Sequence, residues 1–226
     1  MNETKIEWCE KTLNPVVGCS FGCPYCYARR LNTRFKWVED FSEPQFFPER
    51  LSQLKGKGSH SIFMDSMSDV ADWKYEWAQV VYKAIYHAPQ HHYIFLSKRP
   101  ESYFDLFPRW FIEAPNIWLG TTVTEQNDIE RLGSLPIKCN RFISIEPLRG
   151  PINLDLRPYR VASPLADWVI IGAETGNGPG KVIPRREWVD EIVKYCDTHK
   201  IPVFMKDSLL QIMGAQNLRR DFPSEL

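Results

Sequence analysis

Residues 14–26 read Asn14-Pro-Val-Val-Gly-Cys19-Ser-Phe-Gly-Cys23-Pro-Tyr-Cys26 and join a short apolar run to a loop that carries three cysteines. Three residues separate the first two thiols and two separate the last two, so one short loop can wrap one metal centre. Clustered cysteines in a chain without secretory features are typical of metal or redox sites rather than disulfides. The stretch therefore predicts a strand followed by a metal-binding loop, which is the first unit of the expected fold.

The number of thiols on this loop bears on the kind of metal centre. An iron–sulfur cube normally takes four thiolates, so three would leave one iron open to a small molecule. A structural zinc site is instead closed by a fourth ligand, usually from a second close pair or from histidine. The remaining cysteines, Cys9, Cys139 and Cys196, are isolated, although Cys9 lies only ten residues upstream of Cys19. We favour an open iron–sulfur cluster, with a closed zinc site or unligated core cysteines as alternatives.

The three cysteines, with the aromatic Tyr25 directly before the last of them, resemble the cluster loop of the radical S-adenosylmethionine (SAM) enzymes. The resemblance implies a [4Fe–4S] cluster held by Cys19, Cys23 and Cys26. It also implies that SAM chelates the open iron through the amine and carboxylate of its methionine part. One electron from an external donor would then split SAM and yield a 5′-deoxyadenosyl radical, which takes hydrogen from a substrate.

The length and charge of the chain limit the other function classes. With 226 residues the chain fits a single domain, residues 1–226, in which residues 18–27 form the cluster loop and about 214–226 a tail. Basic and acidic side chains balance at 28 each, so no global field draws the protein to nucleic acid or membranes. No segment approaches the roughly 20 apolar residues of a membrane span, and we expect a cytoplasmic protein.

Short apolar runs alternate with helical patterns along the chain, which favours a parallel sheet. The expected strands are Asn14–Gly18, Ser61–Met64, Tyr93–Leu96, Ile117–Gly120, Arg141–Ile145, Trp168–Gly172 and Pro202–Met205. The expected helices are Tyr25–Trp37, Pro48–Leu54, Tyr75–His87, Pro100–Glu113, Glu125–Leu132, Arg186–Thr198 and Ser208–Met213. We therefore predict an α/β fold, a partial TIM-like (β/α)6-7 barrel of parallel strands, with an open doubly wound sheet as the second choice.

In both architectures ligands bind at the carboxyl ends of the strands, so polar residues there are the site candidates. Ser66, Ser68 and Asp69 follow the second expected strand. Radical SAM enzymes often carry a Gly-Gly-Glu type motif there that holds the amino group of SAM, and this chain departs from it. The three residues offer similar acceptors, and Ser and Asp are also common at helix N-caps.

Further candidates follow the later strands. Lys98 is placed to bind the SAM carboxylate or a substrate anion, and Thr121 ends the fourth strand. Glu146 follows the fifth strand, where a buried carboxylate is unfavourable unless it is paired or hydrogen bonded, and we expect it to bind the ribose of SAM. By the resemblance, Tyr25 would lie on the adenine side of SAM.

The catalytic candidates come last in the chain. Glu174 lies in a glycine-bearing turn after the sixth strand, and Lys206 ends the seventh. The same positional rule places both at the carboxyl edge of the sheet. We expect both side chains to face the substrate.

Six longer motifs, taken together, resemble a phage- and mobile-element-associated family of small radical SAM-like proteins. They are Thr-Leu-Asn-Pro-Val-Val-Gly-Cys at 12–19, Asp-Ser-Met-Ser-Asp at 65–69, Ser-Lys-Arg-Pro-Glu at 97–101, Trp-Leu-Gly-Thr-Thr-Val at 118–123, Ser-Ile-Glu-Pro-Leu-Arg-Gly-Pro-Ile at 144–152 and Asp-Trp-Val-Ile-Ile-Gly-Ala-Glu-Thr-Gly at 167–176. The likeness spans about Glu7 to Lys206 and names no substrate.

A basic run after the cysteines bears on the partner. Arg29, Arg30, Arg34 and Lys36 alternate with the aromatic residues Tyr27, Phe35 and Trp37. Such a mixture suits phosphates and stacked bases, and it also suits one solvated helix face. We expect salt-sensitive nucleic-acid binding, and an incompletely closed barrel leaves room for a large substrate or a partner protein. A zinc-stabilised nucleic-acid-binding module and a non-catalytic iron–sulfur redox protein are the alternative functions.

Overall fold

A computed structural model describes residues 1–155, 164–176, 180–224 and 226, and its centre is an eight-stranded sheet. The strands, in their order across the sheet, are β1 (Asn2–Glu3), β2 (Lys11–Thr12), β5 (Ser61–Phe63), β6 (His92–Ser97), β7 (Ile117–Thr122), β8 (Asn140–Ile145), β9 (Trp168–Ile171) and β10 (Val203–Met205). From β2 onward each strand is parallel to its neighbour, and only β1 pairs antiparallel.

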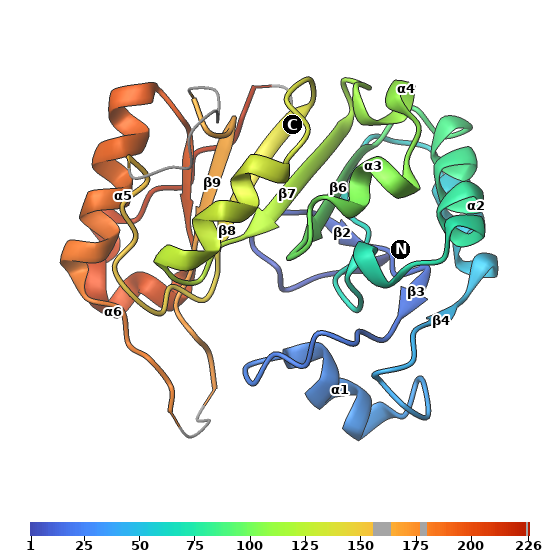
Figure 1. Cartoon of the computed structure of the whole chain (residues 1–226), viewed down its shortest axis with the longest axis horizontal. Coiled ribbons are helices and arrows are strands. Elements are labelled where there is room, and N and C mark those ends of the chain that lie inside the picture. Colours follow the sequence, from blue (N-terminus) through green and yellow to red (C-terminus); the bar gives the residue numbers. More distant parts are fainter. Residues whose placement is uncertain (156–163, 177–179, 225) are drawn as a thin grey trace.

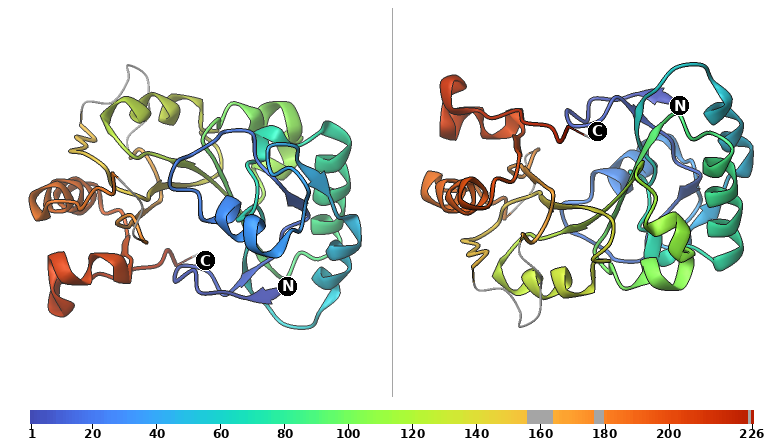
Figure 2. Two further views of the ribbon diagram at one scale, coloured as in Figure 1. Left: turned by 90° about the horizontal axis from the view of Figure 1, so that it is seen from below. Right: turned by 90° about the horizontal axis from the view of Figure 1, so that it is seen from above.

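The sheet curls into part of a barrel, as Figures 1 and 2 show. Because the strands follow the order of the chain, each crossover returns to the neighbouring position, as in a (β/α) barrel. The structure thus confirms the predicted architecture as a mixed α/β fold with a curled, mostly parallel half-barrel sheet.

Both faces of the sheet are buried, which explains why the strands read as continuous apolar runs. The concave face carries aromatic side chains, among them Trp8, Trp118, Phe142 and Trp168. Trp8 and Trp168 meet edge to face with ring centroids 6.3 Å apart. This aromatic layer fills the interior of the half-barrel.

Helices cover the convex face and build the larger core against it. They are α2 (Tyr75–Tyr86), α3 (Ser102–Leu106), α4 (Arg109–Ile112), α5 (Arg186–His199) and α6 (Leu210–Met213), whereas α1 (Tyr27–Phe35) lies apart from them and packs through Ala28 in a smaller cluster beside the cysteine loop. Several expected α-helices are instead 3₁₀ helices, namely Pro48–Lys55 and Gln126–Ser134. The expected helix Pro100–Glu113 is divided into α3 and α4, because Pro108 at its centre lacks the N–H that an uninterrupted helix needs.

The expected first strand, Asn14–Gly18, was misplaced. The strand that enters the barrel at this point is β2, which is parallel to β5. Val16 and Val17 form β3 in a separate antiparallel pair with β4 (Gln45–Phe46). β2 consists of Lys11 and Thr12 and has no apolar run, so only its pairing with β5 identifies it as a strand of the barrel.

The C-terminal tail lies along the outer edge of β10. The amide of Met205 donates to the carbonyl of Arg219 over 2.8 Å, and Phe222 packs on Trp168 with ring centroids 5.5 Å apart. The tail therefore covers a sheet edge and one end of the aromatic layer. Among the described residues, no helix is both long enough and apolar enough to cross a membrane.

Candidate functional site

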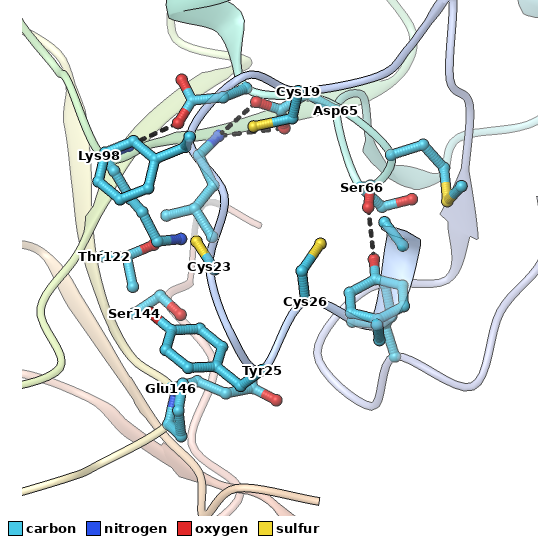
Figure 3. A pocket seen from close by; sticks show the side chains of 18 of the residues that line it. Cys19, Cys23, Tyr25, Cys26, Asp65, Ser66, Lys98, Thr122, Ser144 and Glu146 are labelled. Carbon is cyan, nitrogen blue, oxygen red and sulfur yellow. Dashed lines mark hydrogen bonds between the residues drawn. The ribbon is translucent and has the colours of Figure 1, made fainter. Parts of the chain in front are cut away.

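The three cysteines border one open cavity at the carboxyl edge of the sheet, with a volume of about 200 Å³. Figure 3 shows their side chains around the same space, opposite residues that follow the strands. The polar and charged lining residues from the strand ends are Asp65, Ser66, Ser68, Asp69, Lys98, Thr122, Ser144, Glu146, Glu174, Thr175 and Lys206. The fold thus brings together nearly all of the predicted site residues, of which Cys19 and Lys206 are 187 positions apart in the sequence.

Local geometry sets the start and end of the cysteine loop. Gly18 has φ +116°, and a side chain there would also meet the Cα atom of Pro44 at 2.8 Å, so only glycine fits. At the other end Cys26 is the N-cap of α1, and its sulfur accepts a hydrogen bond from the amide of Arg29 at 3.4 Å. The N-terminus of the helix therefore faces this thiol and fixes its position on the loop.

Two charged side chains brace the loop from outside. The Asp72 carboxylate accepts hydrogen bonds from the backbone amide and the hydroxyl of Ser20, each over 2.8 Å. Arg99 pairs with the same carboxylate at 2.8 Å. Burial tends to raise the pKa of Asp72, but the hydrogen bonds from Ser20 and Arg99 outweigh it and leave the pKa below its usual value. Asp72 is therefore charged at neutral pH and holds the loop firmly.

The donor set fits an iron–sulfur cube better than a single ion. Four ligands of one zinc ion lie at roughly 2.3 Å from it and so crowd together, whereas the ligands of a cube sit on separate irons. Among the described residues, no three His, Cys, Asp or Glu side chains are close enough to hold one metal ion. Cys9 packs beside the aromatic layer of the sheet and does not line the cavity. Within the described part of the chain, the cavity is therefore lined by three thiols and by no fourth one.

Burial affects the thiols before any metal binds. It raises the pKa of Cys19 to about 12, with smaller opposing and reinforcing effects from its neighbours. The free thiol is thus protonated at neutral pH, and metal binding at this position must release a proton.

The loop after β5 contains two buried carboxyl groups. Burial, followed by the nearby charge of Asp69, holds the pKa of Asp65 well above its usual range. Both Asp65 oxygens accept from the amide of Leu96 at 3.2 Å. Asp69 accepts from the amides of Ala71 and Lys98, at 3.0 Å each, and caps the 3₁₀ helix Val70–Asp72. The N-cap interpretation of Asp69 is thus the one that the structure shows.

The serines of this loop are also bonded within the protein. The Ser66 hydroxyl donates to the Asn14 side chain over 3.0 Å, and its carbonyl accepts from the Tyr27 hydroxyl over 2.6 Å. The Ser68 hydroxyl accepts from the indole N–H of Trp73 over 3.0 Å. These side chains border the cavity, but their main contacts shape the loop itself.

Lys98 lines the cavity, and its amine has no ionic partner among the described residues. Its Nζ lies 5.9 Å from the centre of the Phe21 ring and forms no ion pair with any described residue. Arg99 also lies over this ring, but its charge is matched by Asp72. Lys98 therefore supplies a positive charge without a fixed partner, as expected for a residue that binds an anion.

Thr121 lies outside the lining of the cavity. Its side chain is buried and donates to the carbonyl of Ser97 across β6 and β7 over 2.8 Å. The next residue, Thr122, lines the cavity instead. Successive side chains of a strand point to opposite faces, so a shift of one position reverses the assignment.

Glu146 and Lys206 form an ion pair across the sheet, from the ends of β8 and β10. Gly172 lies between them, and a Cβ atom there would meet the Lys206 side chain at 3.1 Å and that of Glu146 at 3.2 Å. The missing side chain of Gly172 thus allows the pair to form. Both residues line the cavity, and the charge of each is balanced by the other.

A second chain of contacts reaches the cysteine loop through Arg149, which the sequence did not single out. Its guanidinium lies 5.4 Å from the centre of the Tyr25 ring and pairs with Glu174 at 3.5 Å. The Oε2 atom of Glu174 is buried and accepts no hydrogen bond from the described residues. Burial raises the pKa of Tyr25. Arg149 thus connects a predicted SAM-binding residue with a predicted catalytic one.

Asp72 was missed by the sequence analysis, Tyr27 was named only within the basic run, and Thr121 was chosen in place of its neighbour Thr122. The Asp72–Ser20 contact joins residues 52 positions apart, and no local pattern indicates it. The motif at 144–152 does contain Arg149, three positions after Glu146, and that spacing was the available signal.

The comparisons with known proteins agree with this architecture. Among solved structures, a cysteine-to-serine mutant of spore photoproduct lyase has a similar fold, with a TM-score of 0.59 over 90% of this chain and 78% of that chain. The sequence identity is 10%, so the likeness shows the fold alone. No curated protein matches the chain in sequence. A family model matches residues 3–212, and the chain therefore belongs to the family described as "Protein of unknown function (DUF5131)".

Proposed function

We propose that the protein is a radical SAM enzyme in which Cys19, Cys23 and Cys26 hold a [4Fe–4S] cluster. The observation that carries this proposal is the shared cavity, in which three thiols from one loop face the carboxyl ends of parallel strands. The fold adds support, because the lyase with a similar fold is a radical SAM enzyme. The cysteine spacing and the fold are independent observations that favour the same superfamily.

When bound, the cluster and SAM would supply a radical able to take hydrogen from a substrate. Lys98 would bind the carboxylate of SAM, because its amine has no ionic partner among the described residues. Tyr25, stacked under Arg149, would form one wall of the adenosine side. An external electron donor completes the proposal.

The loop after β5 would receive the amino group of SAM. Ser66, Ser68 and Asp69 border the cavity, and their hydroxyl and carboxylate oxygens can accept hydrogen bonds from that amino group in addition to those they make within the protein. Glu146 would contact the ribose from within its pair with Lys206.

Glu174 and Lys206 would face the substrate. The buried Oε2 atom of Glu174 lies 3.5 Å from Arg149 but accepts no hydrogen bond from the described residues, so it can accept one from a bound molecule. Lys206 would carry its charge to the same side of the cavity, held by Glu146.

The test is reductive cleavage of SAM by anaerobically reconstituted protein, followed as release of 5′-deoxyadenosine. We expect cleavage by the wild type and none by Cys23→Ala. Cys139→Ala is the matched control, because Cys139 is a half-buried cysteine outside the cavity and should leave cleavage unchanged. Equal cleavage by Cys23→Ala, or a colourless protein that retains zinc, would contradict the proposal.

A further inference from the structure

We propose that the substrate is a single-stranded nucleic acid, bound along the exposed face of α1 with one base in a second cavity beside the cysteines. This inference rests on the proposed function, because it names the substrate class of the same site. Four features carry it: a second cavity, the charges in that cavity, an exposed aromatic pair and the basic face of α1.

The second cavity is larger, with a volume of about 970 Å³. It shares a boundary with the cysteine cavity, formed by Ile6, Tyr27, Ser66, Met67, Glu146, Thr175 and Lys206. The hydrogen bond from Tyr27 to the carbonyl of Ser66 crosses this boundary. A group held in the second cavity would therefore lie next to the proposed SAM site.

The acidic side chains of the second cavity are already matched by cations. The pairs are Glu3 with Lys11, Glu7 with Arg220, Glu146 with Lys206 and Asp207 with Arg220. Lys5 and Arg50 also line the cavity, and neither forms an ion pair with a described residue. The lining thus contains two cations, Lys5 and Arg50, that pair with no described carboxylate, and these can contact the phosphate of a substrate.

Two exposed aromatic rings stand at the C-terminal end of α1. Phe35 and Trp37 stack with ring centroids 5.1 Å apart and planes 25° from parallel. They are 52% and 41% exposed, and Trp37 also lines the second cavity. The pair offers a flat surface from which a chain of stacked bases can continue into the cavity.

The charges beside these rings are basic and unpaired. Arg34 lies 5.1 Å from the centre of the Phe35 ring. None of Arg30, Arg34 and Lys36 forms an ion pair within the described part of the chain. Arg29 differs, because it donates to the Cys19 carbonyl over 2.9 Å and so belongs to the cysteine loop.

Figures 1 and 2 place α1 away from the helices that cover the sheet. In Figure 1, α1 lies alone at the lower edge of the molecule, and the left view of Figure 2 shows it in front of the curled sheet. Aromatic rings alternating with free cations are the features that bind single strands, since rings stack on bases and cations contact phosphates.

Fluorescence anisotropy with a labelled oligothymidylate of about 12 nucleotides, a length within the range such surfaces cover, tests the inference. We expect Trp37→Ala to bind about tenfold more weakly, because stacking on one base contributes that much. Trp37→Phe keeps a ring and should stay close to the wild type. Arg34→Ala and Lys5→Ala should each reduce the dependence of log affinity on log salt by about one.

Trp110→Ala and Lys83→Ala are matched controls. Trp110 is an exposed aromatic residue on α4, and Lys83 is an exposed lysine of α2 without an ion pair among the described residues. Both should leave the affinity unchanged. Labelled RNA and duplex DNA, with thymidine monophosphate as competitor, distinguish a strand from a free nucleotide as the source of the phosphate and base.

Binding is measured without SAM or reductant, so its result stands apart from SAM cleavage. Absence of binding, salt-independent binding, full competition by the mononucleotide or equal weakening in the control variants would overturn the inference. The proposed radical SAM function would survive each of these results. Loss of SAM cleavage with Trp37-dependent binding intact would instead contradict the proposed function alone.

Discussion

The carboxylate of Asp72 accepts hydrogen bonds from both the amide and the hydroxyl of Ser20. The residue that follows the first cysteine is thus held by a residue 52 positions later in the sequence. Asp72 ends a 3₁₀ helix that follows the loop after β5, and its side chain is only 10% exposed. Hydrogen bonds to a charged group contribute about 1.5–3 kcal/mol each. This contact therefore fixes the cysteine loop to the sheet before any cluster binds.

Replacing this carboxylate should loosen the loop. Asp72→Asn removes the charge that pairs with Arg99 and one of the acceptors for Ser20. We expect the free energy of unfolding to fall by about 2 kcal/mol and the iron content after reconstitution to drop. Chemical denaturation and iron analysis measure the two effects. Asp105→Asn, at an exposed position on α3 without a hydrogen-bond or ion-pair partner among the described residues, should change neither. Normal iron content in Asp72→Asn would contradict the prediction.

Gly18 should tolerate no side chain. Gly18→Ala would place a Cβ atom 2.8 Å from the Cα atom of Pro44 at a φ of +116°. Since backbone strain of this kind costs about 1–3 kcal/mol, thermal unfolding should shift to clearly lower temperature. Gly133→Ala is the matched control, because nothing lies within 4 Å of its Cβ position. Equal stability of the two variants would show that the turn adapts.

Asp65 predicts a pH dependence of stability. Its folded pKa lies well above the unfolded value of about 3.9, so the neutral form is the stable one in the folded protein. Its contribution is therefore fully present below about pH 3.9 and is lost as the pH rises through the folded pKa. Asp65→Asn keeps an acceptor for the amide of Leu96 and carries no charge. The free energy of unfolding of the variant should therefore increase relative to that of the wild type as the pH rises. The gain is at most about 1.4 kcal/mol per pH unit, measured by denaturant unfolding, and parallel pH profiles would contradict the assignment.

The Glu146–Lys206 pair should behave as a unit. The two side chains are 26% and 14% exposed, so removal of one partner leaves the other poorly solvated. We expect Lys206→Met to lower the free energy of unfolding by about 2 kcal/mol, less than for a fully buried pair. The double variant Glu146→Gln/Lys206→Met should recover most of this loss. Additive effects in the double-mutant cycle would show that the two residues act independently.

The strands of the half-barrel were largely predictable, because strands covered on both faces need continuous apolar runs. The expected strands at 93–96, 117–120 and 141–145 lie within or overlap β6, β7 and β8. The first strand and the short helices were less predictable. Val16 and Val17 look like any buried strand, and a 3₁₀ helix differs from an α-helix only in its hydrogen bonds.

The candidate site also has residues that the sequence predicts and residues that only the structure reveals. Cys19, Cys23 and Cys26 were identifiable because ligand spacing on one loop is a local property. Thr121 could not be separated from Thr122, since only the register of β7 decides which of them faces the cavity. The pairs Glu146–Lys206 and Arg149–Glu174 join different strand ends, so no local pattern predicts them.

By itself the sequence determined the alternating βα order, the three-thiol loop and the edge of the sheet where polar residues gather, because periodicity and spacing act over a few positions. Only the tertiary structure decided how the charges of that edge are shared. It left Lys98 without an ionic partner among the described residues, paired Glu146 with Lys206 and set the second cavity beside Tyr27. The physical reason is that ion pairs and cavities depend on distances between strand ends, and these exist only once the sheet has curled.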